Sequence, residues 1–528
     1  MAVFGIDLGT TYSCIAYMDD VGRPAIVRLS EGRDILPSVV YFESSDDVSV
    51  GAAAKESALI QPELVVSLIK REMGNDYKTP NIHDRQYSPE EVSAYILRKL
   101  AAEAGQFSGH TVSDVVITVP AYFGAAEREA TRRAGAIAGL NVIDIVSEPV
   151  AAAVDYGVVS GGEDSDILVY DLGGGTFDTT VISIRGGNIQ VVCTDGDHDL
   201  GGADWDRRLV EFFAEEFRAS QPEATDPLES NEVEQDLLKM AEDAKQMLSS
   251  KKELTRKILH DGKRVDVTLT RQGFEDLTRD LLDRTVDITR RTMEEADRRG
   301  VAKFDKVLLV GGSTRMPAVL DRLTDEFSFE VKVHDPDLAV AKGAARYAFE
   351  ESYRNAVITG DTKKAEKLSA GAGLSVEQEQ VITERSIQTV ASRSFGIQVT
   401  DRETRVNSIS HLIHGNDSLP AEVTKTFVTI DDDQEAISVK VNEQLGARES
   451  EKLENNACIG KGDVSIPAGK PHGWPIDVTF KLAKNGTLDV IAIERETGDR
   501  LDLTINVGGM TEDEVEQARQ SVSAAAVS

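Results

Sequence analysis

The sequence predicts a two-lobed α/β domain built by duplication, followed by an antiparallel β domain. Two observations predict the first part: buried-type strands alternate with helical segments over residues 1–350, and each half carries a glycine-bearing turn after an apolar strand. A third observation predicts the second part, because apolar and polar residues alternate from about residue 391 onward. We therefore expect lobe I over about 1–160, lobe II over about 161–350 and a β-rich domain over 391–508.

The two halves repeat the same order of features. The first apolar strand, Val3–Gly9, runs into the turn at 7–11 (DLGTT), and the strand Ile167–Gly173 runs into the turn at 171–176 (DLGGGT). An acid-Pro pair then comes late in each half, at 148–149 and again at 335–336. This shared order favours two like lobes that face a cleft. Chance similarity between two ordinary α/β units is the weaker alternative.

The rest of the chain divides by composition. Residues 351–390 are polar without a clear period, which predicts a linker that is helical in part. In the β-rich domain, Asn485-Gly486 lies between two apolar runs and predicts a hairpin. The last segment, 509–528, is expected to be a short tail with a helix only over Thr511–Ser521.

Charge and composition exclude several classes of function. The chain has 528 residues, and its 58 Lys and Arg against 91 Asp and Glu give a net charge of −33. Such a surface repels nucleic-acid phosphates and anionic membranes, so neither is an expected partner. No apolar run has the ~18 residues of a spanning helix, and the N-terminus lacks the basic region of a signal peptide. The three cysteines are far apart, so we expect a cytoplasmic protein without a disulfide framework.

The two glycine-bearing turns indicate a site for polyphosphate. Successive backbone N–H groups in such turns form an anion nest, and threonine hydroxyls add donors. A carboxylate beside a polyphosphate is costly unless a cation lies between them. Asp7 and Asp171 therefore imply Mg²⁺, held through its waters because Mg²⁺ loses water reluctantly. The P-loop motif and the G-x-G-x-x-G motif at a helix start are both absent from the sequence.

Several motifs together resemble the ATPase domain of the 70-kDa heat-shock chaperones. They are the turns at 7–13 (DLGTTYS) and 171–178 (DLGGGTFD), with 119–123 (VPAYF), 138–142 (AGLNV), 148–149 (EP) and 310–315 (VGGSTR). Actin and the sugar kinases share the fold and the Asp-Gly turns but lack VPAYF and GGSTR at these places. The resemblance covers residues 3–350 and continues more weakly over about 394–515. It implies an actin-like ATPase domain followed by a peptide-binding β-sandwich, with ATP and Mg²⁺ as cofactors.

The resemblance also implies roles for individual residues. Lys70, Glu148, Asp171 and Thr176 would act in hydrolysis, and Asp7 and Asp171 would flank the Mg²⁺, with Asp178 nearby. The other nucleotide-binding residues would be Gly9, Thr10, Thr11, Tyr12, Gly173, Gly174, Gly175, Gly201, Gly202, Glu242, Lys245, Ser249, Gly311, Gly312, Ser313, Arg315 and Asp337. The peptide-binding residues would be Ile397, Val399, Thr400, Phe427, Ile430, Ile437 and Val439.

Ordinary structural interpretations stand beside these roles. Lys70 alone could be a solvated charge at the end of a helix over Glu63–Glu72, and Glu148 could cap the helix that Pro149 opens. Glu242, Lys245 and Ser249 share one helical face, which elsewhere would be a charged surface. The apolar residues of the β domain could equally well be core.

The sequence departs from the family pattern in several places. Gln246 stands where an adenine-stacking Arg is common, and Thr400 is polar where a bulky apolar residue is expected. The following loop, 401–405, is charged, the short apolar linker between the domains is missing, and the C-terminal helical lid is almost absent.

These features lead to one principal functional hypothesis and two alternatives. The principal one is a lid-less, ATP-hydrolysing chaperone that binds unfolded or extended polypeptides, with a J-domain co-chaperone and a nucleotide exchange factor as further partners. The first alternative is a nucleotide-gated module that binds one dedicated partner with little turnover. The second is a small-molecule kinase of the same fold, for which the sequence offers no catalytic Asp beyond the Mg²⁺ acids.

Overall fold

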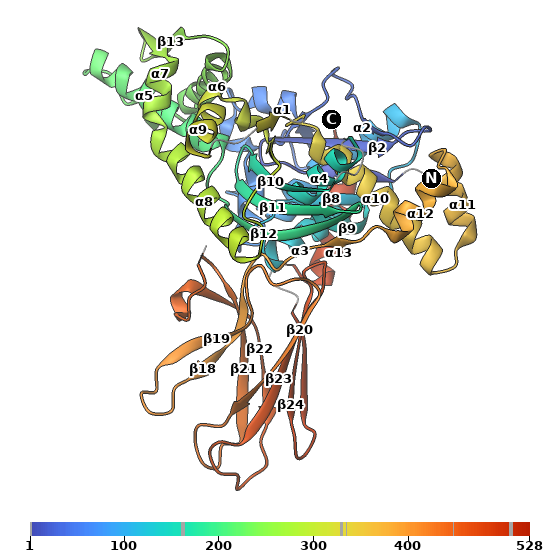
Figure 1. Ribbon diagram of the computed structural model, residues 1–528. Helices are drawn as coiled ribbons and strands as arrows, with labels where there is room; N and C mark the ends of the chain where they lie inside the picture. The colour runs from blue at the N-terminus through green and yellow to red at the C-terminus, as the bar shows by residue number, and fades with distance from the viewer. Residues whose placement is uncertain (1–2, 160–163, 328–330, 334, 447, 506–509) are drawn as a thin grey trace.

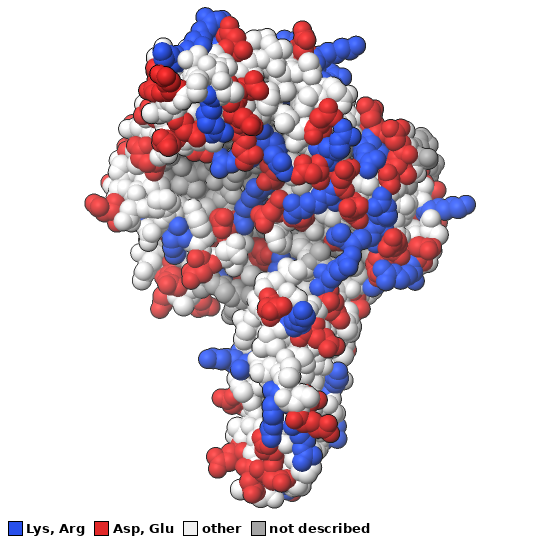
Figure 2. Space-filling view, turned by 90° about the vertical axis from the view of Figure 1, so that its left-hand side faces the viewer, with Lys and Arg blue, Asp and Glu red and all other residues white. Residues whose placement is uncertain are grey.

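The computed structural model describes residues 3–159, 164–327, 331–333, 335–446, 448–505 and 510–528. It is a mixed α/β molecule with several sheets. Two α/β lobes form a broad body, and the β-rich domain projects from it like a stalk (Figure 1). Acidic and basic side chains are interspersed over the face seen in Figure 2. The expected boundaries near residues 160 and 508 lie outside the described residues.

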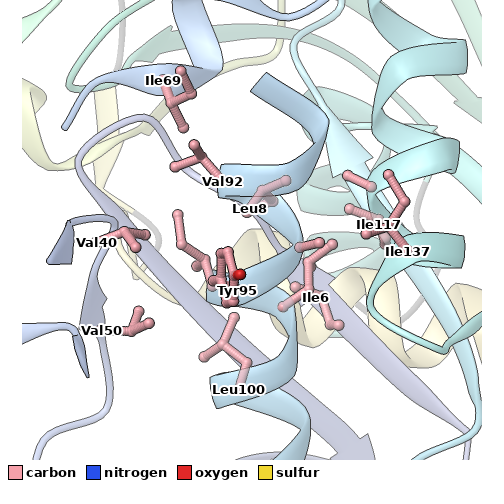
Figure 3. Packing of buried hydrophobic residues seen from close by; sticks show 14 of the residues in the cluster. Ile6, Leu8, Val40, Val50, Ile69, Val92, Tyr95, Leu100, Ile117 and Ile137 are labelled. Atoms are coloured by element: carbon pink, nitrogen blue, oxygen red, sulfur yellow. The ribbon is translucent and has the colours of Figure 1, made fainter. Parts of the chain in front are cut away.

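Lobe I is built on a sheet whose main strand order is β3-β2-β1-β8-β9. The strands are β1 (Phe4–Asp7), β2 (Tyr12–Met18), β3 (Pro24–Ile26), β8 (Asp114–Val119) and β9 (Asn141–Ser147). Helices α2 (Pro89–Ser108) and α3 (Ala125–Ile137) pack with this sheet around a buried apolar cluster. Figure 3 shows part of that cluster, in which Ile6 and Ile117 from the strands and Leu8, just after β1, lie near Tyr95 and Ile137 from the helices.

Lobe II repeats the strand pairing of lobe I. Its sheet has the order β16-β15-β10-β11-β12-β17. β10 pairs antiparallel with β11 and parallel with β15, just as β1 pairs antiparallel with β2 and parallel with β8. This agreement supports the predicted duplication. The strands are β10 (Ser165–Leu172), β11 (Phe177–Arg185), β12 (Asn188–Asp197), β15 (Lys306–Val310), β16 (Val331–Val333) and β17 (Ile387–Gln388).

Further helices and small sheets pack on each of the two lobes. Over lobe I they include α1 (Ala52–Ser57) and the small sheet of β5 (Val40–Phe42), β6 (Asp47–Val50) and β7 (Val65–Val66). Over lobe II they are α5 (Gly202–Ser220), α6 (Asn231–Leu248), α7 (Arg271–Leu277), α8 (Arg279–Arg298) and the hairpin of β13 (Glu253–His260) and β14 (Lys263–Thr270).

The stretch 351–390, which the sequence predicted to be a linker that is helical in part, does contain helices, but it is folded against the lobes. Helix α10 (Ala339–Ile358) runs into this stretch, α11 (Thr362–Gly371) and α12 (Val376–Glu384) follow, and β17 then adds to lobe II beside β12. Only a few apolar side chains, among them Leu368 and Ile382, are buried in the core between the lobes. Because most other residues of these helices face solvent, the composition of the stretch resembles that of a linker.

The β-rich domain consists of two four-stranded sheets that share one apolar core. One sheet contains β18 (Phe395–Thr400), β19 (Asn407–Ile413), β21 (Ala436–Gln444) and β22 (Asn456–Ser465). The other contains β20 (Ala421–Val428), β23 (Pro475–Leu482), β24 (Leu488–Glu494) and β25 (Arg500–Ile505). The predicted hairpin turn is confirmed, since β23 pairs antiparallel with β24 across it and Gly486 has a φ of 88°.

The C-terminal segment returns to lobe I. Helix α13 (Glu512–Ala524) extends the predicted helix by a few residues, and it lies against α3 (Figure 1). Its Ala518 and Val522 are buried in the lobe I core, with Val522 fully inaccessible. Strand β26 (Ala526–Val527) then pairs parallel with β6 at the edge of the small sheet. The β domain is therefore attached to the lobes at both of its ends.

Candidate functional site

A cavity of about 870 Å³ lies between the two lobes and is lined by residues from both. It is far larger than the ~300 Å³ at the lower end for small-molecule sites. Nearly all of the predicted nucleotide and metal residues line it: Asp7, Gly9, Thr10, Thr11, Tyr12, Lys70, Glu148, Asp171, Gly173, Gly174, Thr176, Gly202, Glu242, Lys245, Ser249, Gly311, Gly312, Ser313, Arg315 and Asp337. Gly175 and Gly201 do not line it but lie behind the wall, in contact with each other.

The two glycine-bearing turns meet across the cavity. A Cβ atom added to Gly174 would lie 2.1 Å from the Thr11 hydroxyl oxygen, and one added to Gly175 would lie 2.5 Å from the Thr10 hydroxyl oxygen. Only glycine allows this approach. Gly202 and Ala203, at the start of α5, donate backbone hydrogen bonds to the carbonyls of Gly173 and Gly174 at 3.0 and 2.8 Å. The lobe II turn is thereby fixed against the start of a helix, where anions bind favourably.

Buried carboxyl groups gather where the strands β1, β10 and β11 meet the cavity. Burial, reinforced by the Glu148 carboxylate, raises the pKa of Asp7 to about 7 and the pKa of Asp178 to about 8. The same causes raise the pKa of Asp171 well above its usual range. Lys70 faces this cluster and pairs with Glu148 at 2.7 Å, and the two residues are 4% and 8% exposed. The solvated-charge interpretation of Lys70 is therefore wrong.

The acid cluster fits a divalent cation that binds together with phosphate. Burial and mutual repulsion disfavour the charged form of these carboxyl groups, and a bound cation would counteract both effects. Among the described residues, no group of three or more His, Cys, Asp or Glu could hold a metal ion by itself. Phosphate oxygens and waters would therefore complete the coordination of Mg²⁺ near Asp7 and Asp171, as this ion usually requires.

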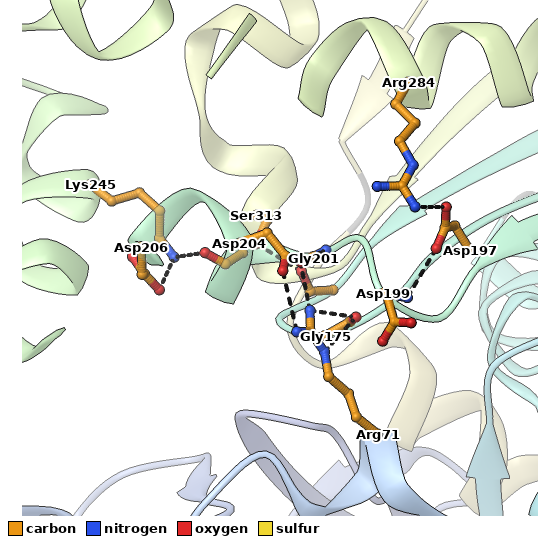
Figure 4. A network of polar contacts seen from close by, with 12 residues as sticks. Arg71, Gly175, Asp197, Asp199, Gly201, Asp204, Asp206, Lys245, Arg284 and Ser313 are labelled. Atoms are coloured by element: carbon orange, nitrogen blue, oxygen red, sulfur yellow. Dashed lines mark hydrogen bonds and ion pairs between the residues drawn. The ribbon is translucent and has the colours of Figure 1, made fainter. Parts of the chain in front are cut away.

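Polar contacts across the cleft join the two lobes, and the sequence did not reveal them. Tyr12 and Lys55 of lobe I both contact the Glu242 carboxylate of α6, Tyr12 with a 2.8 Å hydrogen bond and Lys55 as an ion pair. Arg71 pairs with Asp204 of α5 at 2.6 Å and donates to the Gly175 carbonyl at 2.9 Å (Figure 4). The sequence around Lys55 and Arg71 does not identify them as residues that join the lobes, because their partners lie more than a hundred residues away in sequence.

Comparison with known families agrees with this geometry. The family model described as Hsp70 protein matches residues 3–527. This chain belongs to the Hsp70 family. Hsp70 members are in general ATP-binding chaperones with ATPase activity, and they use Mg²⁺ with the nucleotide. No helix in the described part of this Hsp70 chain is both long enough and apolar enough to span a bilayer.

In this Hsp70 chain the helix α6 and the residue after it bring three expected nucleotide-binding residues, Glu242, Lys245 and Ser249, to the cavity. Lys245 donates to the Gly202 carbonyl at 2.8 Å and pairs with Asp206 at 2.6 Å (Figure 4). Arg315 pairs with Asp337 on the opposite wall. Gln246 also lines the cavity, where its amide makes a long contact of 3.4 Å with Glu242.

Replacing Gln246 with Arg is expected to tighten ADP binding. A guanidinium over the adenine face contributes roughly 0.5–2 kcal/mol, which corresponds to about 2- to 30-fold in affinity. Calorimetry with Mg-ADP measures the change, and Gln235→Arg, at a cavity-lining position away from Gln246 in sequence, is the control for added charge. Unchanged or weaker binding by Gln246→Arg would show that another side chain already covers the base.

The expected peptide residues of this Hsp70 chain fall into two groups. Ile397 and Val439 are buried in the core of the β domain. Val399, Phe427 and Ile437 are half-buried and pack against that core from its edge. Thr400 and Ile430 are also half-buried, and each lies at the start of a loop. An ion pair connects these two loops, because Arg405 donates to both carboxylate oxygens of Asp431, at 2.6 and 3.0 Å.

Proposed function

We propose that this protein is an ATP-dependent chaperone that couples Mg-ATP binding and hydrolysis between two actin-like lobes to the binding of extended polypeptide by the β domain. Lys70 and Glu148 would position the attacking water, Thr176 and the two turns would hold the phosphates, and Asp7 and Asp171 would flank the Mg²⁺. Phosphoryl transfer mainly requires such positioning and charge neutralisation. The edge residues Val399, Phe427 and Ile437, with Thr400 and Ile430, would contact the client.

One observation carries this proposal: a short segment of lobe I touches both the acid cluster and the β domain. The Tyr122 N–H donates to Asp178 at 2.9 Å. Three residues later, the Ala125 N–H donates to the buried carboxylate of Glu443 in β21 at 3.1 Å. The segment 122–125 would therefore transmit a change of charge at the acid cluster to the sheet that would bind the client.

An ion pair strengthens the same contact between lobe I and the β domain. Arg393, which precedes β18, pairs with Glu127 of α3 at 2.5 Å, and its guanidinium lies over the Tyr122 ring at 5.4 Å. Arg393 is only 5% exposed, so solvent screens this contact little. Polar groups therefore make this contact between lobe I and the β domain, in place of the short apolar linker that the sequence lacks.

The attachment of the β domain at both ends favours a second candidate, a nucleotide-gated module with little turnover. ATPase turnover measured with and without an unfolded peptide distinguishes the two. The chaperone requires turnover that peptide stimulates, together with ATP-dependent refolding of a denatured client when a J-domain partner is added. ATP binding without stimulation or refolding would instead support the module.

Stability is expected to fall as pH rises, because of Glu443. Burial, with the nearby Glu127 carboxylate, raises its pKa from 4.5 to about 7, although Arg393 and Arg128 act in the opposite direction. Between these pH values the folded protein keeps a proton that the unfolded chain has released, so the free energy of unfolding decreases as pH rises through this window. The full loss is on the order of 3 kcal/mol.

The variant Glu443→Gln tests this prediction because it keeps the acceptor for the Ala125 N–H and removes the titration. Unfolding midpoints measured from pH 5 to 8 should decline less for this variant than for the native protein. Glu435→Gln, at an exposed position just before the same strand, should keep the native pH dependence. Equal slopes for the native protein and Glu443→Gln would show that Glu443 is already ionised in the folded state.

A further inference from the structure

A second cavity lies where lobe I, lobe II and the β domain meet. Its volume is about 80 Å³, and it shares no lining residue with the nucleotide cavity. Its walls come from α3, β9, β11, β12, the segment 387–392 and the turn after β23. One buried water needs about 10–15 Å³ of such space, so the cavity has room for several waters or one small ion.

Hydrogen-bond donors without full partners line this cavity. Arg128 of α3 donates from Nε to the Phe123 carbonyl at 3.1 Å and, among the described residues, forms no ion pair. The Lys484 ammonium, from the turn after β23, makes only a long contact of 3.5 Å with the Ile387 carbonyl. The Thr389 hydroxyl is buried and has no hydrogen-bond partner in the described structure.

The carboxylate in the wall of this cavity already has hydrogen-bond donors. Asp144 is the one acid among the lining residues, and its carboxylate accepts from the Tyr347 hydroxyl at 2.7 Å and from the Ile145 N–H at 2.8 Å. Burial lowers the pKa of the Arg128 guanidinium, although the carboxylates of Asp144, Glu127 and Asp178 act in the opposite direction.

We propose that this cavity binds a small oxyanion of the size of inorganic phosphate, held by Arg128, Lys484 and the Thr389 hydroxyl. Oxyanions accept several hydrogen bonds at once, and bonds from charged donors are about twice as strong as neutral ones. The three donors belong to lobe I, to the β domain and to the segment that runs from β17 of lobe II to β18. A bound anion therefore links these parts and favours the arrangement in which they are in contact.

Calorimetric titration with inorganic phosphate tests the site in the full-length protein. The nucleotide cavity is first filled with Mg²⁺ and a non-hydrolysable ATP analogue, so that its own phosphate positions are occupied. We expect one saturable phosphate site, weakened about tenfold by Lys484→Gln through the loss of one charge-assisted bond. Thr389→Val should weaken it as well. Hydrogen exchange should slow at 386–392 and 483–487 when phosphate is added.

Lys481→Gln is the matched control, because Lys481 lies on the adjacent strand, is exposed and pairs with Glu422 outside the cavity. It should bind phosphate like the native protein. Absence of binding at 20 mM phosphate would overturn the proposal, as would binding that Lys484→Gln and Lys481→Gln weaken equally. The variants at 484 and 389 change exposed or short side chains, so their folding is checked by their native unfolding midpoints.

Discussion

Replacing Lys70 with alanine is expected to reduce ATP turnover about a hundredfold or more while ATP binding persists. Removing one preorganised donor from a buried reaction site typically costs 10²–10³ in rate. Binding persists because the two turns and the Mg²⁺ acids, which hold the phosphates, come from other segments. Single-turnover hydrolysis and equilibrium ATP binding, measured on the same preparation, separate the two effects.

Lys239→Ala is the control for this experiment. Lys239 also lines the nucleotide cavity, but its ammonium is directed to Glu56 at 2.7 Å, an exposed pair across the rim. Turnover should stay near the native value in this variant. If Lys70→Ala retained native turnover at saturating ATP, Lys70 would have no role in the chemical step, and its pair with Glu148 would be structural.

Replacing Val522 with aspartate is expected to destabilise lobe I by about 3–5 kcal/mol. Val522 is fully buried between α13 and the lobe I core, and an unpaired carboxylate there is costly. For a unit of this size the loss corresponds to a fall of roughly 6–20 °C in Tm. Thermal unfolding measures it, and limited proteolysis should show that the segment after residue 510 becomes accessible.

Ser523→Asp provides the matched comparison, because it adds the same charge to the next residue on the exposed side of α13. Its Tm should stay close to the native value. Equal Tm values for both variants would mean that α13 contributes nothing to lobe I in solution.

Local sequence motifs predicted the residues of the cavity better than they predicted the contacts between the lobes. The turns after β1 and β10 were predictable because each is a contiguous motif whose glycines serve backbone approach. Contacts such as Tyr12 with Glu242 join residues 230 positions apart, and no local pattern encodes such a pairing.

Helix was expected in part of 351–390, but the packing of this stretch against the lobes was missed, for a different reason. The helices α11 and α12 bury few apolar side chains, and capping bonds from Asp361 and Ser375 fix their starts. Ion pairs such as Arg385 with Glu350, at 3.0 Å, hold them to α10. Sequence periodicity detects helices that have an apolar stripe. It does not detect helices that are held mainly by capping hydrogen bonds and ion pairs.

The pairing of β26 with β6 has a consequence for synthesis on the ribosome. The hydroxyls of Ser49 and Ser528, at the two sides of this pairing, are 479 residues apart in sequence. At a synthesis rate of about 5–20 residues per second, roughly 25–100 s pass between the synthesis of β6 and that of its partner strand β26. The outer edge of β6 is unpaired during this time. An unpaired edge strand is a template for association with other chains, so nascent lobe I needs protection during this interval. Slower translation of the second half of the message would lengthen that exposure and increase aggregation of the newly made protein.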